Sequence, residues 1–240
     1  MKENLMDLHT HSVLSKHAFS STTENIEYAQ SIGLKVYGIS EHQTDDKNVG
    51  AHQYCFHNGP RIIPDYYKGM RVLKGIELNI LEGHFDISKF PIERQDYCIA
   101  SMHGYAYSSN HSRQENTDNY IMACNTDYIT IIGHMDDPSH PCHYEKVIIE
   151  AKKNHKLIEL NNASLDPEGS RTGAKENDYI ILDLCKKYNV PIIINSDAHI
   201  KYDIGNFELA FKLLEEVNFP EELIVNYNLD LLNEYIRIYE

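Results

Sequence analysis

The chain has 240 residues, 42% of them hydrophobic and 24% charged, which is enough for a substantial globular core. Its formal net charge of −14 argues against a general binder of nucleic acid or acidic membranes, and no hydrophobic run approaches the roughly 20 residues that span a bilayer. Five cysteines without a C-x-x-C pair are typical of reduced thiols. We therefore expect one cytoplasmic domain over residues 1–240.

The first predicted element is a short strand that leads into His9-Thr10-His11. Residues 4–9 alternate polar and hydrophobic side chains, which places Asp7, His9 and His11 on one face of the strand. Two imidazoles on one face can reach a common cation, and Asp7 is positioned to accept the second ring N–H of a ligating histidine. A lone H-x-H motif is equally typical of a surface loop, so the other elements must decide.

Strand and helix patterns alternate along the rest of the chain. A capping box at Ser21 and Glu24 begins a helix that should end near Gly33. Residues 43–69, which contain several glycines and prolines, should form a long connection. The further strands are predicted at 35–40, 71–80, 97–103, 128–134, 157–162 and 191–199, and the further helices at 115–124, 144–153, 179–188, 207–217 and 230–238. Seven strand–helix units predict an α/β barrel with seven strands, related to the TIM barrel, with a doubly wound open sheet as the alternative.

Good metal ligands recur at the ends of six of the seven predicted strands. They are seven histidines and two carboxylates: His9, His11, His17 on the first loop, His42, Glu77, His103, His134, Asp197 and His199. The C-terminal strand ends of such a barrel meet at one face, so these side chains should converge there. Imidazole and carboxylate together suit Zn²⁺, Mn²⁺ or Fe²⁺. Because a tetrahedral site uses only about three or four protein ligands, nine ligands predict two or three ions.

These motifs resemble the PHP (polymerase and histidinol phosphatase) family of metal-dependent phosphoesterases, and its small stand-alone bacterial phosphatases in particular. The resemblance is carried by His9-Thr10-His11, Ser15-Lys16-His17-Ala18-Phe19-Ser20, Ser40-Glu41-His42, Gly75-Ile76-Glu77, His103, Gly133-His134 and Asn195-Ser196-Asp197-Ala198-His199. The chain departs from the family at Ser40-Glu41, where T-D is usual, and at Met135, where proline is common.

The resemblance implies a distorted (β/α)7 barrel, a single PHP metallophosphoesterase domain, and three divalent ions, with zinc foremost. The three ions would be held by His9, His11, Glu77 and Asp197; by Glu77, His103 and His134; and by His17, His42 and His199. Glu77 would therefore bridge two ions, and Glu77 and Asp197 are the expected catalytic carboxylates.

The expected reaction is hydrolysis of a small phosphomonoester by a hydroxide that bridges two metal ions. Arg61 and Arg171 are the candidate phosphate-binding residues, because arginine offers paired donors to phosphate oxygens; the alternative for each is a solvated surface arginine. Three other functions remain open: a PHP-type nuclease or phosphodiesterase, an amidohydrolase-like enzyme, and a non-catalytic metal-binding protein. The acidic charge and the absence of a basic stripe weigh against a nucleic-acid substrate, and a homo-oligomer is left open.

Overall fold

The computed structural model describes residues 3–44 and 49–236 and is built around seven parallel strands. Neighbouring strands pair in the order β1 (Met6–Asp7), β2 (Val36–Ile39), β4 (Met70–Asn79), β5 (Tyr97–Ser101), β6 (Ile131–Ile132), β7 (Leu157–Asn161) and β8 (Ile192–Asn195). The short strand β3 (Tyr66–Tyr67) pairs antiparallel with the start of β4. Every strand of the predicted set is therefore present, and all seven run in the same direction.

The first and last strands are joined mainly by side-chain amides. The Leu8 N–H donates to Asn195 Oδ1 at 2.9 Å, and the buried Asn226 donates to the carbonyls of both Met6 (3.1 Å) and Ile194 (2.7 Å). Beyond the strand ends, Thr10 and Ala198 form a parallel bridge. The sheet is thus a nearly closed, distorted seven-stranded barrel, so the barrel prediction is confirmed and the doubly wound alternative is wrong.

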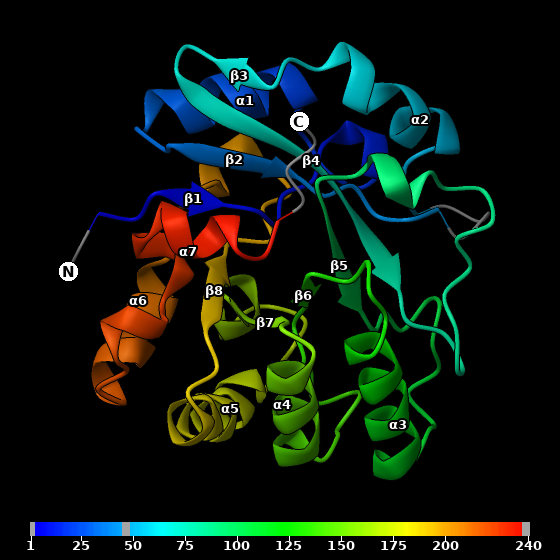
Figure 1. The fold of residues 1–240 in the computed structure, drawn as a ribbon, viewed down its shortest axis with the longest axis vertical. Coiled ribbons are helices and arrows are strands. Elements are labelled where there is room, and N and C mark those ends of the chain that lie inside the picture. The colour runs from blue at the N-terminus through cyan, green and yellow to red at the C-terminus, as the bar shows by residue number, and fades with distance from the viewer. Residues whose placement is uncertain (1–2, 45–48, 237–240) are drawn as a thin grey trace.

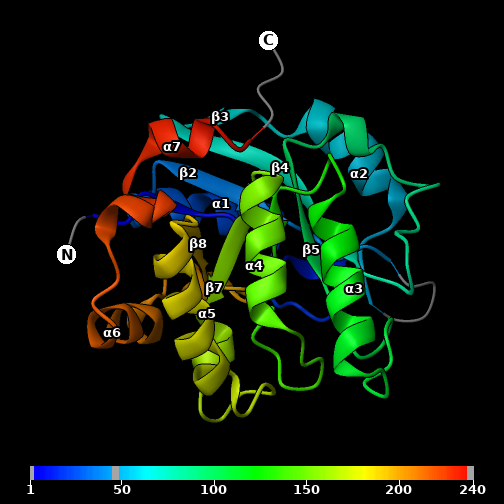
Figure 2. The ribbon, with the colours of Figure 1, turned by 60° about the horizontal axis from the view of Figure 1, so that its bottom comes forward.

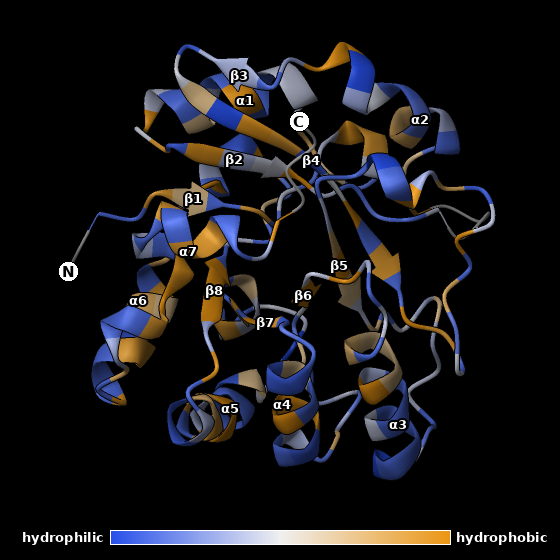
Figure 3. Cartoon of the chain, in the orientation of Figure 1, coloured by the Kyte–Doolittle hydropathy of each residue, from blue (hydrophilic) through white to orange (hydrophobic). Residues whose placement is uncertain are grey.

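The helices lie outside the strands (Figures 1 and 2). They are α1 (Thr22–Ser31), α2 (Gln53–Ile62), α3 (Arg113–Cys124), α4 (Tyr144–Lys153), α5 (Ala174–Tyr188), α6 (Glu208–Glu216) and α7 (Leu229–Asn233). Short 3₁₀ turns occur at Val13–Ser15, Ile92–Arg94, Ala163–Leu165, Lys201–Asp203, Glu221–Leu223 and Val225–Tyr227. The capping box predicted at Ser21 and Glu24 begins α1. Figure 3 shows the usual division of a buried sheet and surface helices: β8 is hydrophobic, whereas α3 and α4 mix hydrophobic and hydrophilic residues.

Several strands are shorter than predicted, such as β6 and β8, and three further differences concern the connection after β2 and two helices. The connection predicted over 43–69 contains α2 and β3, with residues 45–48 outside the described part of the chain. Helix α5 begins directly after Gly173, whose φ of 98° suits glycine, and so starts five residues earlier than predicted. The last helix ends at Asn233, and Arg237 and Ile238 of the predicted range lie outside the described residues.

The interior of the barrel is filled by hydrophobic side chains from every parallel strand. They include Met6, Val36, Leu73, Ile99, Ile131, Leu157 and Ile193, and Leu232 of α7 packs against them. The ring of Tyr97 fits because glycine stands opposite: a Cβ at Gly75 would lie 2.5 Å from Tyr97 Cζ. The Tyr97 hydroxyl donates to the Leu8 carbonyl at 2.6 Å, just before the histidines. This packed core supports the C-terminal strand ends. In the described ranges, no helix combines the length and the hydrophobicity needed to cross a bilayer.

Candidate metal centre

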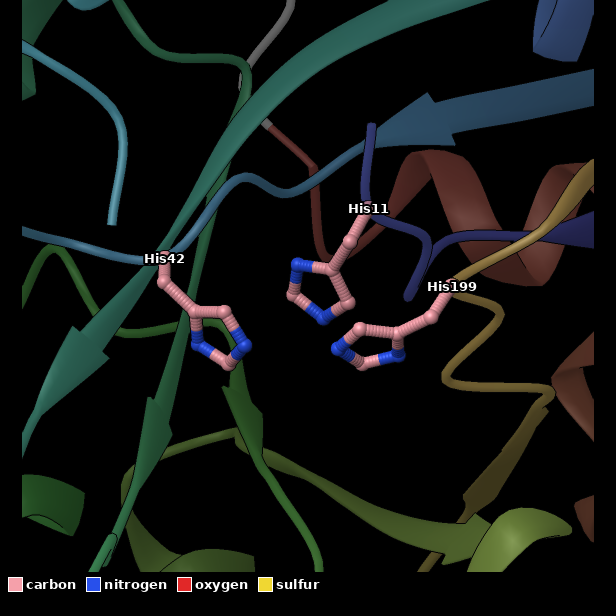
Figure 4. Close-up of side chains that lie close together, drawn as sticks. All are labelled: His11, His42 and His199. Carbon is pink, nitrogen blue, oxygen red and sulfur yellow. The ribbon is translucent and has the colours of Figure 1, made fainter. Parts of the chain in front are cut away.

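The barrel brings the nine predicted ligands to its C-terminal face. His9 and His11 follow β1, His42 follows β2 and forms a backbone bridge with Glu77 on β4, and Asp197 and His199 follow β8. His103 and His134 follow β5 and β6, and His17 lies on the first loop. Figure 4 shows that the imidazoles of His11, His42 and His199, which come from three separate strand ends, face one another. Segments almost 200 residues apart in the chain therefore contribute to one cluster.

The Glu77 carboxylate lies at the middle of this cluster and is fully buried. Its Oε1 is 3.2 Å from the Nε2 atoms of His9, His103 and His134. Its Oε2 is 2.6 Å from His42 Nδ1 and 3.6 Å from His11 Nε2. Burial alone would raise the pKa of Glu77, but the surrounding imidazoles hold that pKa well below its usual value. One ionised carboxylate is therefore shared by five imidazoles.

Four of the ligands lie at separations that a single zinc ion would allow. The Asp197 Oδ1 atom lies 3.1 Å from His11 Nε2 and 3.6 Å from His9 Nε2, and the Glu77 carboxylate lies 3.2 Å from His9 and 3.6 Å from His11. A tetrahedral zinc ion with ligands at about 2.0–2.1 Å has ligand–ligand separations of about 3.3 Å. The four observed separations lie on both sides of that value, so this group has the size of a zinc site.

His17 and His199 face each other at the exposed end of the cluster, with their Nε2 atoms 2.8 Å apart. Each ring donates its Nδ1–H to a backbone carbonyl at 2.9 Å, His17 to Ser15 and His199 to Asp197. In the neutral rings both Nε2 atoms therefore carry lone pairs directed at one another, an arrangement that a shared cation would stabilise. The ligand atoms of His11, His42 and His199 also lie within 4.8 Å of one another, as do those of His9, His11 and Glu77 and those of His42, Glu77 and His103.

The hydrogen bonds around the cluster direct the ligand atoms inward. The Nδ1 atom of His103 bonds to Asn79 Oδ1 at 2.8 Å, and that of His9 bonds to Glu159 Oε1 at 2.7 Å. Within the described residues, His9 Nε2, His103 Nε2 and Glu77 Oε2 are buried, and their close contacts with one another and with His42 lack the angles of a hydrogen bond. Buried polar atoms are normally bonded, and a metal-ligating histidine typically donates its other ring N–H to an acceptor. The donor set and its partners thus fit divalent transition metals.

The protonation states also suit metal binding. Burial, followed by the Coulombic effect of His42, holds the pKa of His11 well below its usual value, and burial lowers the pKa of His103 to about 4. Burial opposes ionisation of Asp197, yet His9, His11 and Arg171 hold its pKa well below the usual range. At neutral pH His11 and His103 are therefore neutral and Asp197 is ionised, which are the forms that bind a metal ion. His9 differs: burial opposes its protonation, but the carboxylates of Glu159, Glu77 and Asp197 raise its pKa well above the usual value, so an ion bound there would displace a proton.

The sequence prediction that Asp7 accepts the second ring N–H of a ligating histidine is wrong. Asp7 accepts from Ser196 Oγ (2.5 Å), Ser196 N and Gly205 N, so it ties β1 to the loop after β8 and does not contact an imidazole nitrogen. The carboxylate partner of His9 is Glu159, a buried residue of β7. The signal that could have identified it is a charged residue between Ile158 and Leu160 in an otherwise hydrophobic strand.

A second buried carboxylate that sequence reasoning missed is Glu41, at one of the departures from the family motif. It accepts from Ser12 Oγ at 2.5 Å and from Ser15 Oγ at 2.6 Å. Ser15 Oγ in turn accepts from the His42 N–H at 3.1 Å, and the Ser15 carbonyl holds His17. Glu41 therefore fastens the first loop, which carries His17, to the end of β2.

The two arginines predicted to bind phosphate occupy different positions. Arg171 donates from Nη1 to Asp197 Oδ2 and to Ser164 Oγ, both at 3.2 Å, and its side chain is 17% exposed at the edge of the cluster. Arg61 is exposed on α2 and donates to Asn58 of the same helix. The structure thus joins Arg171, but not Arg61, to a predicted ligand by a hydrogen bond. Their roles in phosphate binding stay predictions.

The chain is similar in sequence to bacterial proteins named as probable phosphatases. It is 37% identical over 235 residues to one from Clostridium botulinum, covering 97% of this chain and 94% of that protein, and 34% identical over the same shares to one from a Thermoanaerobacter species. In structure it resembles histidinol phosphate phosphatase from Lactococcus lactis, solved with zinc, L-histidinol and phosphate: the TM-score is 0.62 with 16% identity, covering 90% of this chain and 95% of that one. That level of identity supports the shared fold. No protein-family model matches the chain.

Proposed function

The chain belongs to this family of bacterial phosphatases, and we propose that it hydrolyses small phosphomonoesters at a centre of three divalent metal ions. The observation that carries the proposal is the shared environment of Glu77, whose two oxygens lie within 3.6 Å of five imidazoles. One mononuclear site needs only about three or four protein ligands, so the nine ligands, Glu77 among them, exceed what a single ion requires. The motif order supports assignment to the PHP family.

The proposed metal sets are those that the resemblance implies. His9, His11, Glu77 and Asp197 would hold the first ion, Glu77, His103 and His134 the second, and His17, His42 and His199 the third. The separations of 3.1–3.6 Å support the first set, and the facing His17 and His199 rings support the third. His11 and His42 are each near ligands of two of the proposed ions, since each belongs to more than one group of close ligand atoms. Zinc is the preferred ion, because the Lactococcus lactis structure contains it and imidazole with carboxylate suits it.

Bound divalent ions would supply Lewis acidity to the phosphoryl oxygens and activate water for attack on phosphorus at neutral pH. The chain's own residues would provide the geometry. Glu77 and Asp197, both ionised, hold their imidazole partners at fixed separations. Arg171 is fixed by Asp197 and Ser164 through one guanidinium nitrogen, which leaves its other N–H groups to contact a phosphate oxygen. Its alignment would be set before substrate binds.

The proposed substrate class follows from charge. Three divalent ions would bring +6 and the two carboxylates −2, so the centre would be strongly cationic inside an acidic protein. A terminal phosphate that carries two negative charges gains more from such a field than a diester that carries one. Histidinol and phosphate in the Lactococcus lactis structure support a small leaving group.

The experiment compares p-nitrophenyl phosphate with bis(p-nitrophenyl) phosphate on zinc-reconstituted protein, because both release the same leaving group. We expect a higher kcat/KM for the monoester. Equal or higher efficiency on the diester, accompanied by cleavage of an oligonucleotide, would replace the proposal with the nuclease alternative. Metal binding without turnover of either ester would support the non-catalytic alternative.

A further inference from the structure

We propose that Glu159 is a positioning residue that couples two of the metal positions, because it holds His9 for one ion and His134 for the other. The inference rests on the proposed metal centre and extends it to a residue that contacts none of the proposed ions. Glu159 lies in the middle of β7, buried beneath the cluster, where it reaches ligands from two other strand ends.

The Glu159 carboxylate accepts four hydrogen bonds. Its Oε1 accepts from His9 Nδ1 at 2.7 Å and from Asn195 Nδ2 at 2.8 Å. Its Oε2 accepts from the His134 backbone N–H at 2.8 Å and from Asn161 Nδ2 at 3.1 Å. An ionised carboxylate offers about four lone-pair sites, so all of its acceptor capacity is used. The partners belong to the loops after β1 and β6 and to strands β7 and β8, which makes this one carboxylate a junction between four strands.

The bond to His9 determines which ring nitrogen is the ligand. Because Nδ1 donates its proton to Glu159, the lone pair of the neutral ring lies on Nε2. Nε2 is the atom that faces Glu77 at 3.2 Å and Asp197 at 3.6 Å. Glu159 also reaches Asp197 through Asn161, whose amide lies 3.2 Å from Asp197 Oδ2. Two ligands of the first proposed ion therefore depend on Glu159.

The bond to His134 acts on the backbone. His134 has a φ of 25°, a conformation that a residue with a side chain rarely adopts and that needs support from its surroundings. Its N–H points at Glu159, and the resulting orientation of the backbone places Nε2 3.2 Å from Glu77 Oε1. The preceding residue, Gly133, has no room for a side chain, because a Cβ there would lie 2.4 Å from Ser101 Oγ. Glu159 thus also orients a ligand of the second proposed ion.

A glutamine at this position would fit in size but not in hydrogen bonding. Its amide offers one acceptor oxygen, and its NH₂ group must face two of the four donors. The backbone N–H of His134 cannot become an acceptor, so the oxygen should face His134 and the NH₂ group should face His9. His9 would then have to accept at Nδ1 and carry its proton on Nε2, which removes Nε2 as a ligand. Glu159→Gln should therefore affect mainly the first ion, whereas Glu159→Ala should affect both.

The test measures zinc binding by competition with a chromophoric chelator for wild type, Glu159→Gln, Glu159→Ala and a control. Removal of a hydrogen-bond partner behind a metal ligand typically weakens affinity about 10- to 100-fold, and we expect that loss for one zinc in Glu159→Gln and for two in Glu159→Ala. The control is Glu145→Gln, an exposed residue of α4 paired with Lys187, which should bind zinc as wild type does. Unchanged zinc affinity in both Glu159 variants would overturn the proposal.

A second measurement needs no variant and so does not depend on the folding of a mutant. In ¹⁵N-histidine NMR spectra of zinc-loaded wild type, His9 should show a slowly exchanging Nδ1–H and a zinc-bound Nε2. An Nε2–H signal, or zinc on Nδ1, would refute the role assigned to Glu159. Wild type that binds no zinc would refute both the metal centre and this inference, whereas a zinc-dependent phosphatase with normal Glu159 variants would refute this inference alone.

Discussion

Replacement of Glu77 by glutamine removes one negative charge and almost no volume. Glu77 is fully buried, and its Oε1 lies 3.2 Å from three imidazole nitrogens. In the proposed arrangement the carboxylate belongs to two metal sets. We therefore expect Glu77→Gln to weaken two ions together and to abolish phosphate release, since Asp197, the other carboxylate of the proposed sets, belongs to only one of them.

The size of the effect can be estimated from the free energy that a buried charge contributes to the interaction with its partners. Removal of one member of a buried ion pair costs roughly 3–5 kcal/mol. At about 1.4 kcal/mol for each factor of ten, that is about a 140- to 4,000-fold loss of affinity for each of the two ions. His199→Ala is the matched comparison. It removes a neutral ligand from the partly exposed end of the cluster and should weaken chiefly one ion.

The assay is chelator competition, followed by elemental analysis of the protein after gel filtration. Glu77→Gln should retain about two zinc ions fewer than wild type, and His199→Ala about one fewer. If both variants lose one ion, and the same one, the bridging role of Glu77 is wrong. Circular dichroism of each metal-free variant checks that the barrel is intact.

Three further predictions follow from the contacts around the centre. Arg171→Ala should raise KM for a phosphomonoester by roughly 10-fold or more, as expected for loss of a charged hydrogen bond, while exposed Arg94→Ala leaves steady-state kinetics unchanged. The pKa of His103 is about 4 in the metal-free fold, because of burial, against about 6.5 in an unfolded chain, so the unfolded state binds more protons between these values. The free energy of unfolding of the metal-free protein should therefore fall as the pH drops from about 6.5 to 4, by roughly 3 kcal/mol from this group, and a urea titration series that shows no such fall would contradict it. Tyr97→Phe should lower the free energy of unfolding by about 1–3 kcal/mol, because the buried Leu8 carbonyl loses its donor; equal urea midpoints would count against this.

The positions of the strands along the chain and the ligand set could be predicted because they follow from local sequence. Hydrophobic runs such as Ile192–Asn195 identify buried parallel strands, and the residue just after each run must lie at the C-terminal face of the barrel. His103 and His134 were located in this way without knowledge of which strands are neighbours. The imidazole and carboxylate groups of the predicted ligands then indicated that the site binds divalent metal ions.

Non-local contacts explain the misassigned carboxylate. The alternation that places Asp7 beside His9 requires an extended strand, but β1 contains only Met6 and Asp7. The Asp7 carboxylate instead accepts hydrogen bonds from Ser196 and Gly205, which lie about 190 residues further along the chain. The bond from His9 to Glu159 spans 150 residues, and such pairing cannot be read from spacing.

Helix α2 was missed for a different reason. Its sequence contains Gly59 and Pro60, both poor helix formers, so residues 43–69 resembled a connection. In the structure, contacts with residues beyond the helix stabilise it. Phe56 is buried against Phe90, with 5.3 Å between the ring centres, and His52 caps the first turn by accepting from the Tyr54 N–H. Tertiary packing here outweighs local propensity.

The central claim is that three divalent ions occupy one cluster of ligands, with Glu77 shared by two of them, and a count of ions tests it most directly. Elemental analysis of gently purified, zinc-reconstituted protein should find between two and three zinc ions per chain, with phosphatase activity that rises as the sites fill. Dipicolinate should remove both the ions and the activity, and added zinc should restore them. One ion or fewer per chain after reconstitution, with full phosphomonoesterase activity, would contradict the account.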